Sequence, residues 1–341
     1  MKILIMNTTG LGNILLFLPA YHYLIENIPD VEVTVVYDSK WFGDEFMHYQ
    51  FKEAKRFVYY PANKKRIFSL FLCYLKIIKQ KYDYILIPYT GITFRRLLSF
   101  KFIRSRNKIY FTEKFKKWKN FIFIEDKPNE HYVVKNKKQV EYILRHKNDK
   151  IPFENKKYIR IENLIDEKKI NNKLWIGFHP GGNVQFNPYR QWPSIYYKAL
   201  VKLLTEVYQN NLHIFIFGRG CYEDKLIDFI MEGQEKIVTK VLNHPLKDVA
   251  LKIKNCDIFV GNDSGLMHLA SGLGVKTLGL FGPTNPLRTG PFGEITQILR
   301  VNLDCSPCFN FGSYKSCEHF SCLWSIKPEN VYKKLNKMLK Q

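Results

Sequence analysis

The chain has 341 residues, of which 46% are hydrophobic, and 53 Lys and Arg stand against 31 Asp and Glu, a formal net charge of +22. This composition is typical of a folded protein long enough for two domains, and it excludes a disordered chain. The excess of positive charge predicts an anionic partner: a nucleic acid, a phosphorylated substrate or an acidic membrane surface.

The apolar segments are too short to cross a membrane. The best candidate, residues 67–78, contains Lys76 and falls well short of the roughly 20 residues that a spanning helix needs. The apolar run after Met1 and Lys2 is also too short for a signal peptide. We therefore expect a cytoplasmic protein whose seven cysteines are mostly reduced.

Short strands alternate with helices through the first part of the chain. Strands are predicted at residues 2–6, 31–37, 57–60 and 84–88, and helices at 14–28 and 67–80. This alternation is typical of a doubly wound parallel α/β sheet. The turn after the first strand contains Gly10, Gly12 and Asn13 but no third glycine, which disfavours a dinucleotide-binding dehydrogenase.

Residues 95–119 are both basic and aromatic. They begin with Arg95 and Arg96 and hold ten Lys or Arg against one Glu, with Phe, Tyr and Trp interleaved. Three interpretations stay open: a solvated basic face, a single-stranded nucleic-acid site, and contact with an anionic membrane or acidic acceptor. We favour the membrane or acceptor over nucleic acid.

A charged segment at residues 166–173 has little to bury and marks a domain boundary. We predict a first, acceptor-binding domain at residues 1–168. A second, nucleotide-sugar-binding domain follows at 169–325 and ends in a cysteine-rich stretch. Residues 326–341 should form a basic helix that packs back on the first domain.

The second domain begins with a strand at 174–178 that runs into the sequence His-Pro-Gly-Gly, in which Gly181 and Gly182 suit an anion-binding nest of N–H groups. Downstream, Arg190 could clamp a phosphate with two hydrogen bonds. Glu223 follows a strand at 213–217. Its carboxylate would hold ribose hydroxyls or simply favour the first turn of a helix.

Residues 261–268 form the central motif, a polar turn between an apolar strand and a helix. Ligands of open parallel sheets bind at this end of the strands, where a new helix offers free N–H groups to an anion. Asp263 would accept hydrogen bonds from sugar hydroxyls, and Ser264 would occupy the N-cap. Gly265 would let phosphate oxygens approach, while His268 would donate to a phosphate.

Another glycine turn, at residues 282–284, follows the strand predicted at 277–281. Because these turns all follow strands of one half-chain, we expect them to converge on one crevice that grips a phosphate-rich ligand. Two Rossmann-like, doubly wound domains that face a cleft are the architecture of GT-B nucleotide-sugar glycosyltransferases.

Six motifs occur in a fixed order between Met1 and about Trp324. They are GNILL at 12–16, PA at 19–20, HPGG at 179–182, RQWP at 190–193, DSGLMH at 263–268 and FGPT at 281–284. Together they resemble glycosyltransferase family 9, the lipopolysaccharide heptosyltransferases. The resemblance implies a GT-B fold and inverting transfer of heptose from ADP-heptose onto a lipopolysaccharide core or related phosphorylated glycolipid, at the inner face of the cytoplasmic membrane.

The resemblance also implies roles for individual residues. The diphosphate would contact Gly181, Gly182, Arg190, Ser264 and Gly265, and the ribose would contact Glu223. Asp263 and His268 would act at the sugar and phosphate end of the donor. The acceptor-binding candidates are Gly12, Asn13, Arg95 and Arg96.

One position departs from the family pattern. The family carries an Asp that is proposed to deprotonate the acceptor hydroxyl, but this chain has Asn13, and an amide is not basic enough to take a proton. Asn13 would then position the acceptor. Asp38, Asp44 and Glu45 are alternative bases, and a different acceptor is a further alternative.

No Asp-x-Asp pair occurs in the sequence, so the usual signature of a metal-dependent GT-A transferase is missing, and we expect no cofactor for the chemistry. Arg190, backbone N–H groups and helix dipoles would stabilise the leaving diphosphate. Four cysteines suggest a structural Zn or Fe site, with free thiols or occasional disulfides as the alternative. They are Cys305, Cys308, Cys317 and Cys322.

Other functions stay open beside the main one. A protein O-heptosyltransferase, a transferase that uses another nucleotide sugar and a non-catalytic nucleotide-sugar binder would all keep the fold. A nucleic-acid-binding protein with a cysteine-rich metal knuckle would leave the motif at 263–268 unexplained, so no nucleic-acid partner is expected.

Overall fold

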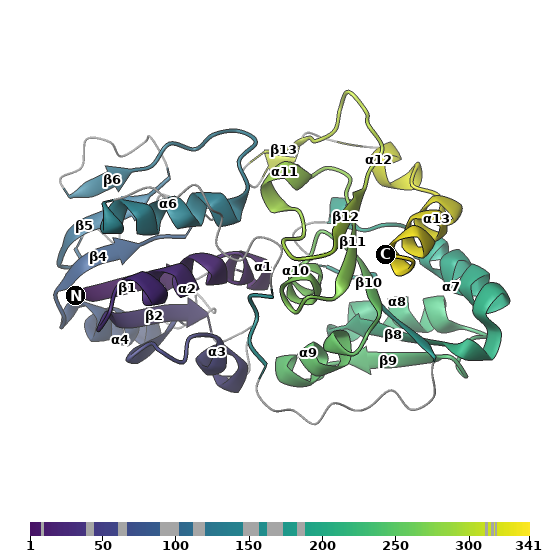
Figure 1. Cartoon of the computed structure of the whole chain (residues 1–341), viewed down its shortest axis with the longest axis horizontal. Helices are drawn as coiled ribbons and strands as arrows, with labels where there is room; N and C mark the ends of the chain where they lie inside the picture. The colour runs from purple at the N-terminus through teal and green to yellow at the C-terminus, as the bar shows by residue number, and fades with distance from the viewer. Residues whose placement is uncertain are drawn as a thin grey trace. The chain divides into compact units, whose positions relative to one another are not determined.

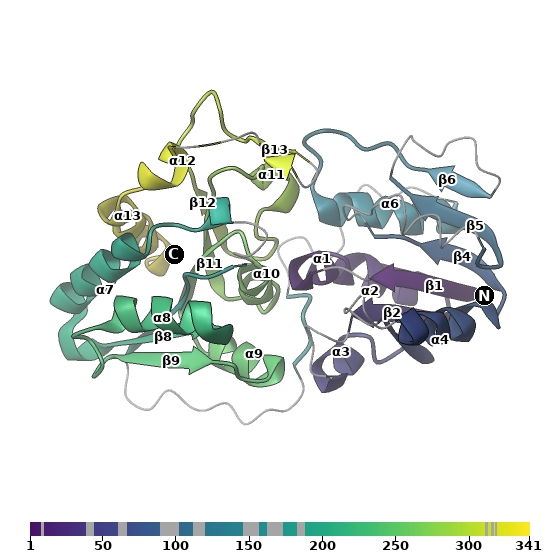
Figure 2. The same cartoon turned by 180° about the vertical axis from the view of Figure 1, so that it is seen from behind.

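The computed structural model describes residues 1–7, 10–38, 44–60, 67–88, 102–111, 120–145, 157–161, 173–182, 188–310, 313–314, 317 and 319–341. The chain forms two compact units, Met1–Pro152 and Phe153–Gln341 (Figure 1). Each unit contains a six-stranded parallel sheet with helices on both of its faces (Figure 2). The doubly wound α/β architecture expected for each half is therefore present.

The first unit has the strand order β3-β2-β1-β4-β5-β6. The strands are β1 Lys2–Asn7, β2 Glu32–Asp38, β3 Arg56–Tyr60, β4 Tyr82–Leu86, β5 Ser105–Tyr110 and β6 Phe121–Phe123. The helices are α1 Leu11–Leu15, α2 Leu18–Asn27, α3 Asp44–Gln50, α4 Ile67–Ile78 and α6 Tyr132–Leu144. In the central strand β1, Ile5 pairs with Val35 on one side and Leu86 on the other. Side chains of β1 are buried on both faces, which explains its continuous apolar run.

The second unit has the strand order β12-β11-β10-β7-β8-β9. Its strands are β7 Leu174–His179, β8 Leu212–Gly218, β9 Val238–Leu242, β10 Ile258–Asn262, β11 Lys276–Leu280 and β12 Thr296–Leu299. A small antiparallel hairpin is formed by β13 Phe309–Asn310 and β14 Ser313–Tyr314. The sheet grows from β7 in both directions, so its topological switch point lies between β7 and β10, where ligands of such sheets bind.

The helices of the second unit cover both faces of this sheet (Figure 1). They are α7 Ser194–Tyr208, α8 Gly220–Met231, α9 Leu246–Lys254, α10 Gly265–Gly272, α11 Pro286–Thr289, α12 Ser321–Trp324 and α13 Pro328–Leu339, with 3-10 helices η3 Pro188–Arg190 and η4 Gln209–Asn211. The buried face of α7 packs on the same apolar core as β7, β8 and β10. Within this core, Trp192 is fully buried and its indole N–H donates to the Ile326 carbonyl at 2.8 Å.

The C-terminal helix has an apolar face that belongs to the second unit. Val331, Leu335 and Met338 of α13 are buried in the core of that unit, against α7 and β11. An apolar stripe repeated every three to four residues shows that a helix packs, but it does not identify the surface that receives it.

Two segments of the first unit differ from the sequence prediction. Gly12 and Asn13, expected in a turn, lie inside the short helix α1, and the Asn13 N–H donates to the Gly10 carbonyl at 3.1 Å. Part of the basic segment forms strand β5, in which Lys108 is buried with its Nζ 5.3 Å from the ring centroid of Phe121. Burial lowers the pKa of Lys108.

Among the described residues, no helix has both the length and the apolar character required to span a membrane.

Candidate functional site

Asn262, the last residue of β10, joins the two strands of the switch point. Its Nδ2 donates to the carbonyls of Pro180 and Gly181, at 2.8 and 3.0 Å. Its Oδ1 accepts from the Trp192 N–H at 3.0 Å and from the Tyr197 hydroxyl at 3.4 Å. Asn262 is 1% exposed, and both polar atoms of its side-chain amide have hydrogen-bond partners, as a buried amide requires. One side chain therefore fixes the glycine turn after β7 and the segment that follows Arg190.

Glu223, from the first turn of α8, is 8% exposed and reaches the same glycine turn. Its carboxylate accepts from the Gly182 N–H at 2.9 Å and from the Arg219 N–H at 2.7 Å. His179 Nε2 lies 3.7 Å from Glu223 Oε2. Burial raises the pKa of Glu223, but the hydrogen bond and charge of His179, with the two backbone N–H groups, outweigh it and lower the pKa below its usual value. Glu223 is therefore an ionised carboxylate beside a turn rich in N–H groups.

His179 links Glu223 to the helix that follows β10. Its Nδ1 lies 2.8 Å from the hydroxyl oxygen of Ser264. If Nε2 carries the proton, facing the Glu223 carboxylate, then Nδ1 is an acceptor and the Ser264 hydroxyl must donate to it. The proton of the Ser264 hydroxyl is then engaged with His179.

The N-terminus of α10 keeps its N–H groups available. Ser264 occupies the N-cap with an extended backbone, as expected, but within the described chain its side chain makes no capping hydrogen bond, because its hydroxyl bonds to His179 instead. The first N–H groups of the helix, beginning at Gly265, therefore add to the positive end of the helix dipole. A phosphate would satisfy these N–H groups in place of a side-chain cap.

Arg190 and Asp263 meet at the same edge of the sheet. Arg190 ends η3, and its Nη1 lies 3.3 Å from Oδ2 of Asp263. His268, one turn into α10, places Nε2 3.9 Å from the other oxygen, Oδ1. Asp263 and His268 are 7% and 3% exposed. The predicted residues Arg190, Asp263 and His268 are thus brought together.

Tyr158 and Ile159 form hydrogen bonds to the backbone of α10. The N–H groups of Tyr158 and Ile159 both donate to the Gly272 carbonyl at 3.0 Å, and the Tyr158 hydroxyl donates to the His268 carbonyl at 3.4 Å. Burial raises the pKa of Tyr158, so the hydroxyl keeps its proton for that bond. These contacts fix the backbone that carries His268.

Glycine at position 181 leaves room for the carboxylate of Glu223. A Cβ at this position would lie 2.1 Å from Oε1 and 2.3 Å from Cδ of Glu223. The carboxylate therefore occupies the space that a side chain at Gly181 would need.

The glycine turn after β11 anchors the cysteine-rich stretch. The Cys308 and Phe309 N–H groups donate to the Pro283 carbonyl at 3.0 and 2.9 Å, and the Ser306 hydroxyl donates to the Gly282 carbonyl at 2.6 Å. Strand β11 neighbours β10. The cysteine-rich stretch is therefore bonded to the turn beside the one that contains Asp263.

The four predicted metal ligands, Cys305, Cys308, Cys317 and Cys322, are free thiols in the structure. In the described part of the chain, no three His, Cys, Asp or Glu side chains are placed to hold a metal ion together. Burial raises the pKa of Cys322, and the charges of the other three thiols raise it further, against a hydrogen bond from the Leu323 N–H. The structure therefore does not support the predicted Zn or Fe site as a formed ligand set.

The acceptor candidates belong to the first unit. Gly12 and Asn13 lie in α1, whereas Arg95 and Arg96 fall outside the described residues. Of the alternative bases, Asp38 ends β2, Asp44 begins α3, and Glu45 is exposed in the same helix.

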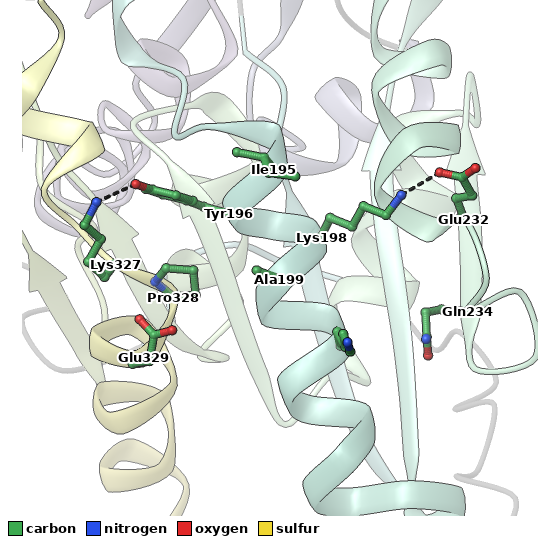
Figure 3. A pocket seen from close by; sticks show the side chains of 10 residues that line it. Ile195, Tyr196, Lys198, Ala199, Glu232, Gln234, Lys327, Pro328 and Glu329 are labelled. Atoms are coloured by element: carbon green, nitrogen blue, oxygen red, sulfur yellow. Dashed lines mark hydrogen bonds and ion pairs between the residues drawn. The ribbon is translucent and has the colours of Figure 1, made fainter.

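A hollow of about 550 Å³ in the second unit contains none of the predicted site residues. It lies between the first half of α7, the loop after α8 and the start of α13 (Figure 3). Two of the lysines that line it already have partners there: Lys198 is bonded to Glu232 at 2.5 Å and Lys327 to the Tyr196 hydroxyl at 2.6 Å. The chemistry therefore points to the edge of β7 and β10 instead.

Two residues that organise the site were not predicted as site residues. Asn262 could have been singled out as a polar residue that ends a buried strand. His179 belongs to the HPGG motif, but its bond to Ser264 depends on β7 and β10 being neighbours, which no local pattern reveals.

The carboxyl ends of β7 and β10 together present N–H groups, one arginine and an ionised carboxylate. Such a set can bind a diphosphate and the hydroxyls of a neighbouring ribose.

Comparison with known proteins gives a consistent picture. The model of glycosyltransferase family 9 (heptosyltransferase) matches residues 117–319, more than half of the chain. Lipooligosaccharide heptosyltransferase 2 of Campylobacter jejuni is 31% identical over 177 residues, which cover 50% of this chain and 52% of that protein. The chain thus spans about half the length of this curated relative.

Two solved structures share the fold over nearly the whole length. Escherichia coli heptosyltransferase WaaC with ADP has a TM-score of 0.77 at 15% identity and covers 99% of this chain and 100% of its own. E. coli ADP-heptose lps heptosyltransferase II has a TM-score of 0.75 at 19% identity and covers 100% and 99%. The GT-B fold predicted from the motifs is confirmed.

Proposed function

This chain belongs to glycosyltransferase family 9, and from that premise we propose that it transfers heptose from ADP-heptose onto a lipopolysaccharide core or a related phosphorylated glycolipid. The observation that carries the proposal is the meeting of Arg190, Glu223 and Ser264 around the glycine turn after β7 and the start of α10. The relatives are named as heptosyltransferases, and one solved structure of the same fold holds ADP. Both support ADP-heptose as the donor.

In this proposal the donor lies across the carboxyl ends of β7 and β10. The N–H groups of Gly181 and Gly265 would bind the diphosphate together with Arg190. Gly182 and Ser264 would join them by exchanging their present partners, Glu223 and His179, for a phosphate oxygen. Glu223, held ionised, would accept hydrogen bonds from the ribose hydroxyls. Asp263 and His268 would lie at the sugar end.

The reaction is a displacement at the anomeric carbon. The acceptor hydroxyl oxygen forms a bond to that carbon, the bond to the diphosphate oxygen breaks, and ADP leaves with the bonding electron pair. Arg190 and the α10 N-terminus would stabilise the charge that develops on the diphosphate. Asp263 would keep the guanidinium in place for that task.

The proton of the acceptor hydroxyl needs a base. Asn13 cannot take it, because a neutral amide has no useful basicity. We retain Asp38, Asp44 and Glu45 as candidate bases and assign Asn13 to positioning the acceptor. Gly12, Arg95 and Arg96 remain acceptor-binding proposals, and the basic segment 95–119 would face an anionic glycolipid at the inner membrane surface.

A structural Zn or Fe bound by the four cysteines also remains a proposal. The proposal rests on the sequence, in which the four cysteines lie within 18 residues, although in the described part of the chain no three of them are placed to hold a metal ion together. Metal analysis of the purified protein tests it. One equivalent of metal, lost in a Cys322→Ser variant, would support the site, and a metal-free chain of unchanged stability would remove it.

Calorimetric titration with ADP, UDP, GDP and ADP-heptose tests the donor assignment. We expect ADP-heptose to bind tightest and Asp263→Ala to weaken it and abolish transfer while the unit stays folded. Gln191→Ala, outside the proposed contacts, is a control for general disturbance near Arg190. Preference for another nucleotide would point to a different sugar donor.

Transfer assays distinguish the remaining alternatives. Turnover with a lipopolysaccharide acceptor supports the proposal, whereas turnover only with a protein acceptor would favour a protein O-heptosyltransferase. Donor binding without transfer to either would favour a non-catalytic binder, and salt-sensitive nucleic-acid binding without nucleotide binding would overturn the proposal.

A further inference from the structure

We propose that Phe309 is a positioning residue that holds the Arg190 guanidinium in the donor site, an inference that rests on the function proposed above. The Cζ atom of Arg190 lies 4.9 Å from the centroid of the Phe309 ring. Its Nη1 lies 3.3 Å from Asp263 Oδ2. The guanidinium therefore has an aromatic ring and a carboxylate as simultaneous partners.

The two partners act on different parts of the guanidinium. The Asp263 carboxylate attracts the guanidinium through its charge, in an ion pair at Nη1, whereas an aromatic ring attracts a cation that lies within about 6 Å of its centroid. With a carboxylate alone, an arginine that is 25% exposed retains several rotamers that keep the ion pair. A second contact removes many of them, and a diphosphate then meets a group that is already ordered.

Phe309 is itself well fixed. Its N–H donates to the Pro283 carbonyl at 2.9 Å, next to the Cys308 bond to the same oxygen. It pairs with Tyr314 in the β13–β14 hairpin. Pro283 belongs to the turn that follows β11, so the ring is tied to the sheet that carries Asp263. The ring can therefore act as a support rather than follow the arginine.

This placement gives the cysteine-rich stretch a role at the donor site, whether or not it binds a metal. The stretch runs from Cys305 to Cys322, and Phe309 within it contacts Arg190. The contact is specific for the charged guanidinium, so its loss should affect the phosphates of the donor and not the nucleoside.

The test compares ADP with adenosine by calorimetry, in the wild-type chain, Phe309→Leu and Phe309→Tyr. Leucine keeps an apolar side chain but removes the ring. We expect it to weaken ADP binding about 5- to 10-fold and to leave adenosine binding within about twofold. Tyrosine keeps the ring face and should restore ADP affinity.

Phe229→Leu is the matched control. Phe229 stacks with Lys198, whose Nζ lies 4.7 Å from the ring centroid, and this pair lies outside the donor site. The same substitution there should leave ADP binding unchanged. Melting temperatures of all variants show whether the unit is folded.

Three results would contradict the inference. Unchanged ADP affinity in Phe309→Leu, with the wild type binding ADP, would overturn it and leave the proposed function standing. Equal weakening of ADP and adenosine, or failure of tyrosine to rescue, would show a merely structural role. A wild-type chain that binds no ADP would remove the proposed function, and the inference with it.

Discussion

Arg190 and Asp263 form an ion pair whose two members differ in burial. The distance from Nη1 to Oδ2 is 3.3 Å, and the exposed fractions of the side chains are 25% for Arg190 and 5% for Asp263. A carboxylate this deeply buried needs a positive partner, whereas an arginine that stays partly in solvent can also be solvated by water. The two members of the pair therefore depend on each other unequally.

This asymmetry predicts different costs for the two truncations. Arg190→Ala leaves a buried charge without its partner and should lower the free energy of unfolding by about 2–4 kcal/mol, somewhat less than a fully buried pair would. Asp263→Ala leaves an arginine that water can reach and should cost about 1 kcal/mol. Urea unfolding measures both, and the double variant should be more stable than Arg190→Ala. Equal costs would contradict the unequal burial.

Gly181→Ala should damage the donor site more than the fold. Its Cβ would lie 2.1 Å from Glu223 Oε1, so the carboxylate must move away from the Gly182 N–H. We expect a destabilisation of about 1–3 kcal/mol and a loss of ADP affinity of at least about tenfold, or 1.4 kcal/mol. Gly10→Ala, where no atom lies within 4 Å of the new Cβ, is the stability control. Wild-type affinity in Gly181→Ala would separate Glu223 from nucleotide binding.

Glu223 should contribute stability that depends on pH. Its pKa is lowered in the folded state, so this stability is present above the unfolded carboxyl pKa of about 4.3 and is lost as the pH falls through the folded value. Glu223→Gln replaces two acceptor oxygens by one and should melt several degrees lower at neutral pH.

The check is the difference in melting temperature between wild type and Glu223→Gln as a function of pH. It should stay constant from pH 7 to about pH 5 and shrink below about pH 4. A difference that grows toward acid pH would mean that the folded pKa of Glu223 is raised, against the contacts from His179, Gly182 and Arg219.

Asn13→Asp should increase the rate of transfer if α1 faces the acceptor. A carboxylate at this position can take the proton that an amide cannot, and general bases contribute about 10²- to 10⁴-fold, so a gain of at least about tenfold is expected. ADP binding should be unchanged, because Asn13 is not among the residues proposed to bind the donor. Asn13→Ala is the matched control. If Asn13→Asp is no faster than wild type, the base lies elsewhere.

The sequence predicted β7, β8, β10 and β11 of the second unit within one or two residues, because buried parallel strands are apolar runs that end in glycine and polar residues. Strands β9 and β12 were not predicted. Segment 105–110 was missed because Arg106 and Lys108 mask a strand whose burial is decided by tertiary contacts, such as that of Lys108 with Phe121. Gly12 was assigned to a turn because glycine is a weak helix former, yet it lies in α1.

The candidate site was predicted at the level of its motifs but not of its contacts. Asp263 and Ser264 were identifiable because they lie between a strand and a helix, and Arg190 because it begins the RQWP motif ahead of a helix. The bond from His179 to Ser264 and the contact of Phe309 with Arg190 join segments 85 and more than 100 residues apart. Such contacts depend on the order of the strands in the sheet and on the paths of the loops, and neither can be predicted from a short stretch of sequence.

Strand β10 lies between β7, which is synthesised before it, and β11, which is synthesised after it. A ribosome delivers β7, β8 and β9 first, and these can pair while β10 is still inside the exit tunnel. During that interval one edge of β7 has unpaired N–H and C=O groups, which can recruit a foreign strand. The arrival of β10 covers that edge, and Asn262 then fastens it to Pro180 and Gly181. A nascent chain halted before residue 258 would thus lack residues proposed to bind the donor and would expose an unpaired strand edge. The residues of the proposed nucleotide site therefore also protect the chain from pairing with a foreign strand.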